Sequence, residues 1–172
     1  MKRSSFPRAT GVEFYVAAEQ AAQGFSAVNE FLTTRLAEPP GEAFFQLSTA
    51  PAIRHLFRVV SGLDSMVLGE TEILGQVKKA YAAASAGKTT SKHLNKLFQR
   101  AFNVAKDVRT NTNITRGAVS VGSAAVELAE KIFGKLSTCH VMILGAGETS
   151  ELTAGALAAR GGALHLRGQP FL

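Results

Sequence analysis

Residues 54–77 read RHLFRVVSGLDSMVLGETEILGQV, and they combine a histidine, three carboxylates, two serines and a glutamine with apolar residues and three glycines. Polar atoms that such a segment buries need hydrogen-bonding partners, and the glycines favour backbone that bends or approaches another group closely. Two interpretations are open. His55, Ser65, Glu70 and Gln76 form a pocket wall that faces a polar ligand, or their polar groups cap and bridge two helices joined by a turn.

The residues before this stretch alternate between strand and helix patterns. Residues 12–16 and 44–47 have the spacing of short strands, and apolar residues recur at helical spacing over residues 25–36. A helix is predicted to begin near Thr49 and to carry His55. The order strand, helix, strand, helix predicts an α+β domain with helices on one face of a sheet.

The residues after the stretch divide at a polar break, residues 111–117. Amphipathic helices are predicted over residues 73–84, 94–108 and 121–136. A short apolar run at residues 141–144, a glycine turn, a helix over residues 149–160 and a strand over residues 163–167 then predict the first β-α-β unit of a Rossmann domain. The sequence therefore predicts two incomplete domains, residues 1–112 and residues 113–172.

The glycine turn indicates a dinucleotide phosphate site. Gly145 and Gly147 allow a tight turn, and the free NH groups of the next helix favour a pyrophosphate. No Asp or Glu lies about 20 residues beyond Gly145, where an acid would bind the ribose of NAD. Arg167 lies in that region and would suit a 2′-phosphate, so NADP is favoured.

The charge of the chain is concentrated in one region. The net charge is +6, and residues 78–116 hold nine Lys or Arg against one acid, Asp107. Lys92, Lys96, Arg100 and Lys106 fall on one face of the predicted helix opposite its apolar stripe. This basic face is either ordinary solvated surface or a site for a polyanion.

The bulk composition excludes several classes of protein. No apolar run reaches the roughly 18 to 20 residues that span a bilayer, and the basic residues at the start are not followed by the apolar block of a signal peptide, so a cytoplasmic protein without membrane contact is expected. A single cysteine excludes an intrachain disulfide and a cysteine-rich zinc site, and no metal site is predicted.

Four ordered segments carry a resemblance to a known family: residues 54–77, 106–113, 118–125 and 145–152. Over residues 11–159 the chain resembles glutamyl-tRNA reductase. The resemblance implies NADPH-dependent reduction of glutamyl-tRNA to glutamate 1-semialdehyde for tetrapyrrole synthesis. It implies glutamyl-tRNA, the downstream aminomutase and a second reductase subunit as partners, although the family's C-terminal dimerisation domain is absent from this chain.

The resemblance also assigns roles by position. It implies that His55 is the activity-critical histidine. Ser65, Glu70, Thr71, Glu72 and Gln76 would contact the substrate. The NADP turn would be formed by Gly145, Ala146, Gly147, Glu148, Thr149 and Ser150.

The family's nucleophilic cysteine has no counterpart at the matching position. In the family, Asn and Arg follow the cysteine. A Glu comes one residue after that Arg, and a Tyr lies two positions after the Glu. Here Glu13 and Tyr15 have this spacing, and no cysteine precedes them. Cys139 precedes the predicted Rossmann strand and is interpreted as a thiol of that domain rather than as the nucleophile. A shortened, inactive reductase is therefore expected, the alternatives being a tRNA-binding remnant without chemistry and a fragment without a role.

Overall fold

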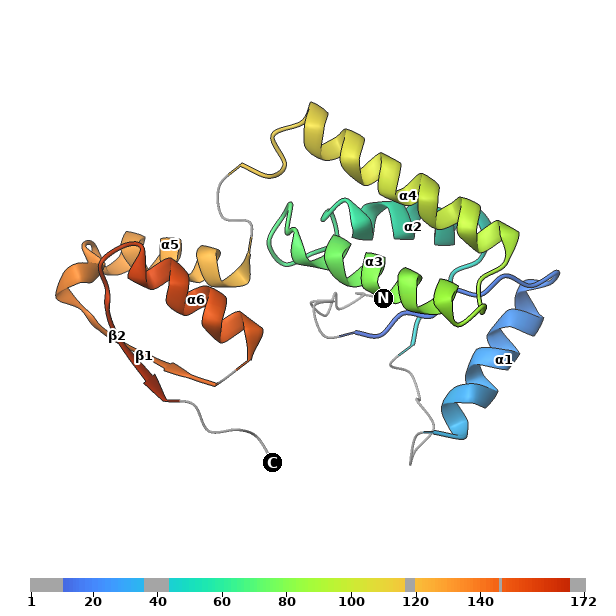
Figure 1. Cartoon of the computed structure of the whole chain (residues 1–172), viewed down its shortest axis with the longest axis horizontal. Helices are drawn as coiled ribbons and strands as arrows, with labels where there is room; N and C mark the ends of the chain where they lie inside the picture. The colour runs from blue at the N-terminus through green and yellow to red at the C-terminus, as the bar shows by residue number, and fades with distance from the viewer. Residues whose placement is uncertain (1–10, 36–43, 117–119, 146, 168–172) are drawn as a thin grey trace, which may run out of the picture.

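The computed structural model describes residues 11–35, 44–116, 120–145 and 147–167, with the backbone alone for residues 148 and 163–167 (Figure 1). Residues 11–116, here called the helical unit, contain α1 (Ala21–Thr33), α2 (Thr49–Val60), α3 (Glu72–Ala86) and α4 (Lys92–Asn111). Residues 120–167, the βαβ unit, contain α5 (Val121–Phe133), a 3-10 turn (Leu136–Thr138), β1 (His140–Leu144), α6 (Glu148–Ala158) and β2 (Ala163–Arg167). Among the described helices, none has both the length and the apolar character that crossing a bilayer requires.

The core of the helical unit lies where α2 packs on α4. Leu56 and Val60 of α2 are fully buried, and they meet Phe98, Ala101 and Ala105 of α4. The two alanines lie one turn apart, so their small side chains allow the helices to approach closely. Aromatic rings extend this core, since the ring centroids of Tyr15, Tyr81 and Phe102 lie 5.5, 5.4 and 6.2 Å from that of Phe98. This packing fixes the helix that carries His55.

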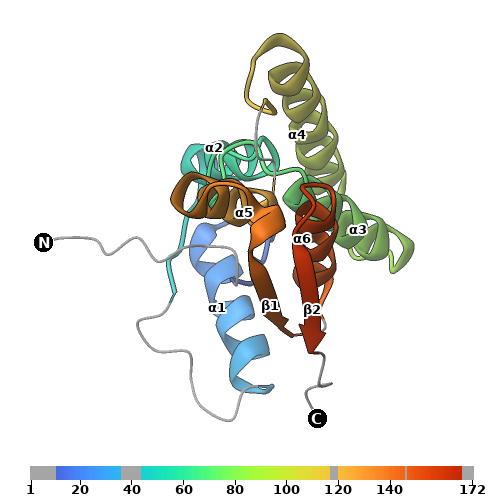
Figure 2. The ribbon, with the colours of Figure 1, turned by 90° about the vertical axis from the view of Figure 1, so that its left-hand side faces the viewer.

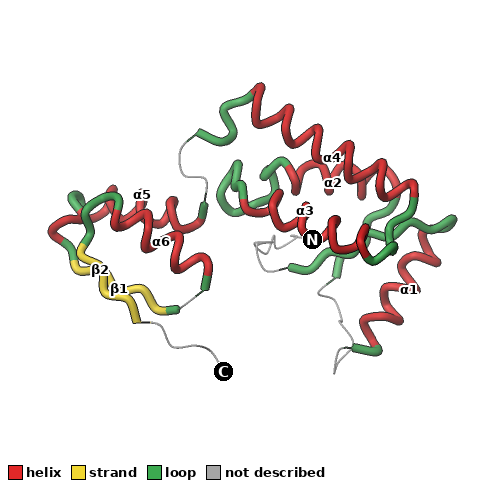
Figure 3. Tube along the Cα trace, viewed as in Figure 1, coloured by secondary structure: helices red, strands yellow, loops and turns green. Residues whose placement is uncertain are grey.

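The two strands predicted for the helical unit are absent from its described residues. Residues 11–18 and 44–48 are extended, but β1 and β2 are the only paired strands in the described chain, as Figure 3 shows in yellow. A strand needs the backbone of a neighbour, and these segments pack by side chains instead. Phe14 contacts Phe31 of α1, with 5.8 Å between ring centroids, and Tyr15 contacts Phe98. The described part of this unit is therefore helical, and the strands predicted over residues 12–16 and 44–47 do not form there.

The βαβ unit has the predicted topology. Strands β1 and β2 are parallel, with His140 opposite Ala163 and Leu144 opposite Arg167, and α6 connects them (Figure 2). Helices α5 and α6 lie on one side of the strands and bury Val126, Leu136 and Leu157 between them and the sheet. Gly122 of α5 lies against Thr153 of α6 so closely that a methyl group would not fit. The start of a Rossmann-type domain is therefore confirmed.

Candidate functional site

His55 lies between two carboxylates from distant parts of the helical unit. Its side chain is 9% exposed; Nε2 lies 2.8 Å from Oε1 of Glu13, and Nδ1 lies 3.3 Å from Oδ2 of Asp64. The ring of Phe45 packs edge-on against the imidazole, with 5.4 Å between centroids. Helix α2 supplies the histidine, the extended segment before α1 supplies Glu13, and the turn after α2 supplies Asp64. Both ring nitrogens are thus held in place.

Each carboxylate has a second partner. The Tyr15 hydroxyl donates to Oε2 of Glu13 at 2.6 Å. Nε and Nη2 of Arg58 donate to Oδ1 of Asp64 at 3.2 and 2.9 Å. Burial, and next the hydrogen bond to Glu13, raise the pKa of Tyr15 far above its usual range, so the phenol stays protonated and remains a donor.

A polar cavity of about 440 Å³ opens beside His55. Its lining residues are Ala50, Pro51, Arg54, His55, Arg58 and Asp64. Arg54 is exposed one turn of helix before Arg58, so two guanidinium groups lie at this cavity. Guanidinium groups bind carboxylates and phosphates, and an imidazole can transfer a proton. The cavity therefore has the groups to bind an anion next to a proton carrier.

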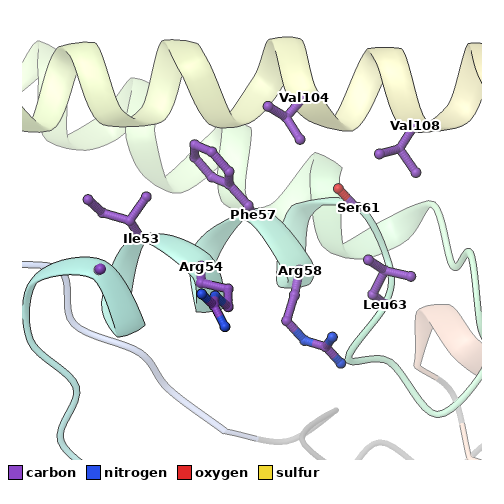
Figure 4. Close-up of a pocket in the computed structure, with 9 residues that line it drawn as sticks. Ile53, Arg54, Phe57, Arg58, Ser61, Leu63, Val104 and Val108 are labelled. Carbon is purple, nitrogen blue, oxygen red and sulfur yellow. The ribbon is translucent and has the colours of Figure 1, made fainter.

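A second, apolar cavity of about 390 Å³ lies between α2 and α4. In Figure 4, Ile53 and Phe57 point from α2 toward α4, where Val104 and Val108 line the cavity, while Arg54 and Arg58 point away from α4. Ala50, Arg54 and Arg58 line both cavities, so the apolar cavity and the polar cavity of His55 adjoin along α2.

The predicted substrate residues are not among those that line the two cavities. Ser65 is half-buried in the turn between α2 and α3, Thr71 is exposed, and Gln76 is exposed and donates to Glu72 at 3.0 Å. Neither cavity has any of these residues or Glu70 in its lining. The structure thus groups His55 with Glu13, Tyr15, Arg58 and Asp64, which the sequence analysis did not select as site residues. A signal was present, because Glu13 and Tyr15 matched the family's nucleophile segment.

Glu70 is a buried carboxyl group with an incomplete set of partners. The residue is 6% exposed, and its backbone oxygen accepts a hydrogen bond from Nη2 of Arg109 at 3.1 Å. Within the described structure, Oε2 of Glu70, Nε of Arg109 and Oγ of Ser61 are buried without a hydrogen-bonding partner. Burial, followed by the nearby charge of Glu72, raises the pKa of Glu70, and a hydrogen bond from Ser65 opposes this.

Glu70→Gln is expected to remove part of the pH dependence of stability. The pKa of Glu70 is higher in the folded state than in the unfolded chain. As the pH rises above about 4.5, the unfolded chain therefore loses this proton first. The free energy of unfolding then falls until the pH passes the folded-state pKa. The measurement is the urea midpoint at several pH values from 4 to 7. Glu30→Gln, at an exposed position of α1, is the matched control. An unchanged decline in Glu70→Gln would contradict this account.

The glycine turn lies between β1 and α6. Gly145 follows β1 with φ 126°, a value that favours glycine, and the Oγ of Ser150 lies 3.1 Å from where a Cβ would stand. Gly147 is the N-cap of α6, so the first NH groups of this helix point out of the turn near Thr149. These features fit a pyrophosphate. Ala146 and the side chains of Glu148 and Arg167 lie outside the described residues.

Cys139 lies in the βαβ unit. It directly precedes β1, is half-buried, and its Sγ lies 3.9 Å from the backbone oxygen of Lys135. It belongs to neither the His55 cluster nor the lining of the two cavities. Its position at the start of the Rossmann strand is the one expected from the sequence.

Comparison with known proteins matches the two units to two families. Residues 10–112 match the family model described as "Glutamyl-tRNAGlu reductase, N-terminal domain", and residues 127–165 match "Shikimate / quinate 5-dehydrogenase". A glutamyl-tRNA reductase from Akkermansia muciniphila is 58% identical over 118 residues, which are 69% of this chain and 35% of that protein. One from Syntrophus aciditrophicus is 52% identical over 145 residues, 80% of this chain and 34% of that protein.

A solved structure is also similar. The glutamyl-tRNA reductase from Methanopyrus kandleri is 45% identical, with a TM-score of 0.48 over 74% of this chain and 32% of that chain. The chain spans about a third of the length of the curated relatives that it matches.

Proposed function

Because this chain belongs to the glutamyl-tRNA reductase family, we propose that its function is the NADPH-dependent reduction of glutamyl-tRNA to glutamate 1-semialdehyde, a step of tetrapyrrole synthesis. The observation that carries the proposal is the His55 cluster. It lies within the residues that match the N-terminal domain of this family, and it borders a cavity that carries two arginines. Such a cavity suits the acidic glutamyl group beside a proton carrier.

The proposed division of labour follows the two units. Residues 1–112 form the substrate domain and residues 113–172 the start of the cofactor domain. His55 serves the reaction directly. The bound substrate reaches beyond the cavity, along the turn after α2 and the first turns of α3. Its contacts there are made by Ser65, Glu70, Thr71, Glu72 and Gln76.

The cofactor proposal is NADPH at the glycine turn. The βαβ unit matches a dehydrogenase family, which supports a nicotinamide cofactor. Gly145, Gly147, Thr149 and Ser150 would hold its pyrophosphate at the N-terminus of α6, together with residues 146 and 148. The cofactor supplies a hydride when bound, and the residues of this chain bind and orient it. The lack of an acid near the end of β2 supports NADPH over NADH.

A second candidate function is tRNA binding without chemistry. It is favoured by the distance in sequence between Cys139, the single cysteine, and the Glu13 segment where the family has its nucleophile. Both functions predict tRNA binding, and only the reductase predicts hydride transfer. The test is the loss of nicotinamide absorbance when NADPH and glutamyl-tRNA are mixed with the protein. A complete lack of oxidation at any NADPH concentration would overturn the reductase proposal for this chain and leave binding.

The basic face of α4 is the proposed tRNA surface. Lys92, Lys96, Arg100 and Lys106 are all exposed. In the described structure none of these four cations forms a salt bridge with an acid. Opposite this face the helix buries Phe98, Ala101 and Ala105, so the cations are presented outward from a rigid element. Such groups would contact phosphates without reading sequence.

The double substitution Lys96→Glu, Arg100→Glu is expected to weaken tRNA binding about tenfold or more at low salt. It should also reduce the slope of log affinity against log salt by about 0.7 to 0.9 for each phosphate that the variant no longer neutralises. Fluorescence anisotropy of labelled tRNA at several salt concentrations measures both. Lys135→Glu reverses an exposed charge on the βαβ unit and is the matched control. If the control variant lost as much affinity for tRNA, binding would depend on the net charge of the protein and not on this face.

A further inference from the structure

A hydrogen bond joins α4 to the turn that carries predicted substrate residues. Nη2 of Arg109, in the last turn of α4, donates to the backbone oxygen of Glu70 at 3.1 Å. Arg109 lies one turn of helix after Ala105, which is buried, so it projects from the face of α4 that packs on α2. It is half-buried, whereas Lys96 and Arg100 of the basic face are exposed. Arg109 is therefore placed to hold the turn from the inner side of α4.

The turn between α2 and α3 is a short loop that is closed at its base. The NH of Gly69 donates to the oxygen of Gly62 at 2.9 Å, and both glycines have a positive φ. The NH of Glu70 donates to the oxygen of Val67 at 3.2 Å. Gly69 also lies against the backbone of Ile114, just after α4. The turn thus has hydrogen bonds of its own, and α4 and the segment after it hold the turn from outside.

Arg109 bonds to the backbone of Glu70 and not to its carboxyl group. A guanidinium has five N–H donors, and a hydrogen bond from a charged donor is stronger than one from a neutral donor. In the described structure, Oε2 of Glu70 is buried without a hydrogen-bonding partner. The carboxyl group of Glu70 can therefore accept a further hydrogen bond while Arg109 keeps the backbone in place.

We propose that Arg109 is a positioning residue for substrate specificity: its bond to the backbone of Glu70 fixes the turn so that Ser65, Glu70 and Thr71 contact the glutamyl group. This inference rests on the proposed function, which assigns these three residues to the substrate. Helix α4 then serves the substrate on two sides. Its basic face binds phosphates of the tRNA, and Arg109 on its buried side holds the residues that distinguish glutamyl-tRNA from uncharged tRNA.

Two other roles for Arg109 make different predictions. As a further phosphate contact, it would strengthen the binding of every tRNA, whether or not the tRNA carries a glutamyl group. As a purely structural residue, it would stabilise the whole helical unit, and its loss would speed amide hydrogen exchange throughout that unit. Only the positioning role predicts a local change in the turn together with a loss of preference for glutamyl-tRNA.

The first measurement is amide hydrogen exchange of the protein without NADPH or tRNA, followed by NMR. Arg109→Met keeps the apolar stem of the side chain but has no donor. In this variant the amides of Gly69 and Glu70 are expected to exchange about tenfold faster, whereas those of Ala101 and Ala105 in the core of α4 keep their rates. Arg109→Lys retains a charged donor and is expected to restore most of the protection. Equal acceleration of both pairs of amides, or none at Gly69 and Glu70, would overturn the positioning role.

The second measurement is the ratio of the affinities for glutamyl-tRNA and uncharged tRNA, from fluorescence anisotropy without NADPH. The unchanged protein is expected to prefer glutamyl-tRNA, Arg109→Met to lose this preference, and Arg109→Lys to regain most of it. Arg100→Met removes the same charge from the exposed face of the same helix and is the matched control. It is expected to weaken the binding of both tRNAs alike, so the ratio stays the same. If Arg109→Met also left the ratio unchanged, Arg109 would be a phosphate contact and its positioning role would be overturned.

Failure of the proposed function gives a different pattern of results. A lack of hydride transfer would change neither the exchange rates nor the ratio of affinities, because both are measured without NADPH. If the unchanged protein bound both tRNAs equally, the substrate roles of Ser65, Glu70 and Thr71 would fall, and the specificity role of Arg109 would fall with them. A preference for glutamyl-tRNA that survives in Arg109→Met would overturn the role of Arg109 and leave the proposed function intact.

Discussion

Gly69→Ala is expected to destabilise the helical unit by about 3 kcal/mol, because the glycine meets two separate constraints. Its φ of 83° lies in the left-handed region, which costs a side chain roughly 1 to 2 kcal/mol. An added Cβ would also overlap the backbone oxygen of Ile114, so the turn or the segment after α4 must move. Overpacking of this kind costs about 1 to 3 kcal/mol. Urea denaturation followed by circular dichroism measures the loss.

Gly75→Ala is the matched control for that substitution. Gly75 lies inside α3, and no atom lies within 4 Å of the position of an added Cβ. Alanine is favoured over glycine in a helix by about 0.5 to 1 kcal/mol, so this variant is expected to be slightly more stable than the original chain. If Gly69→Ala were as stable as Gly75→Ala, the close contact with Ile114 would be refuted.

Leu56→Ala is expected to cost about 2 to 5 kcal/mol. Leu56 is fully buried between α2 and α4, where it meets Ala101, Ala105 and Phe98. These neighbours lie on a rigid helix and cannot move in to fill the space, so a cavity remains. The free energy of unfolding from urea titration is the measurement. Since His55 directly precedes this residue, its NMR signal should broaden as α2 loosens.

The control for this cavity is Ile53→Ala on the same helix. Ile53 is 43% exposed at the apolar cavity, so water can occupy much of the space that its side chain leaves. The expected cost is below about 1.5 kcal/mol. Equal losses for the two substitutions would show that α2 is not anchored through Leu56.

Helices were predictable here because their signal is local. Apolar spacing placed helices over residues 73–84 and 94–108, and the structure has α3 and α4 there, each slightly longer at both ends. The predicted helix over residues 121–136 ends at Phe133, since Gly134 adopts a φ of 76° that stops it. The parallel strands were predictable for the same reason, as the glycine turn between apolar runs is a local pattern.

The errors and omissions come from contacts between distant residues. Alternation at residues 12–16 suggested a strand, but a strand depends on a neighbour that no local pattern reveals, and the segment packs on α1 and α4 instead. The pairing of His55 with Glu13 was likewise missed, because Glu13 lies 42 positions earlier in the chain. The family resemblance is confirmed by the match over residues 10–112, whereas the substrate and cofactor roles of individual residues remain predictions.

The separation of the two buried clusters has an evolutionary consequence. The cluster around Leu56 and Phe98 and the cluster around Val126 and Leu157 have no residue in common. A gene rearrangement that joined either unit to a new neighbour would therefore leave its buried packing intact. Residues 127–165 of the βαβ unit match a different family model from the helical unit, which agrees with this separation of the two cores.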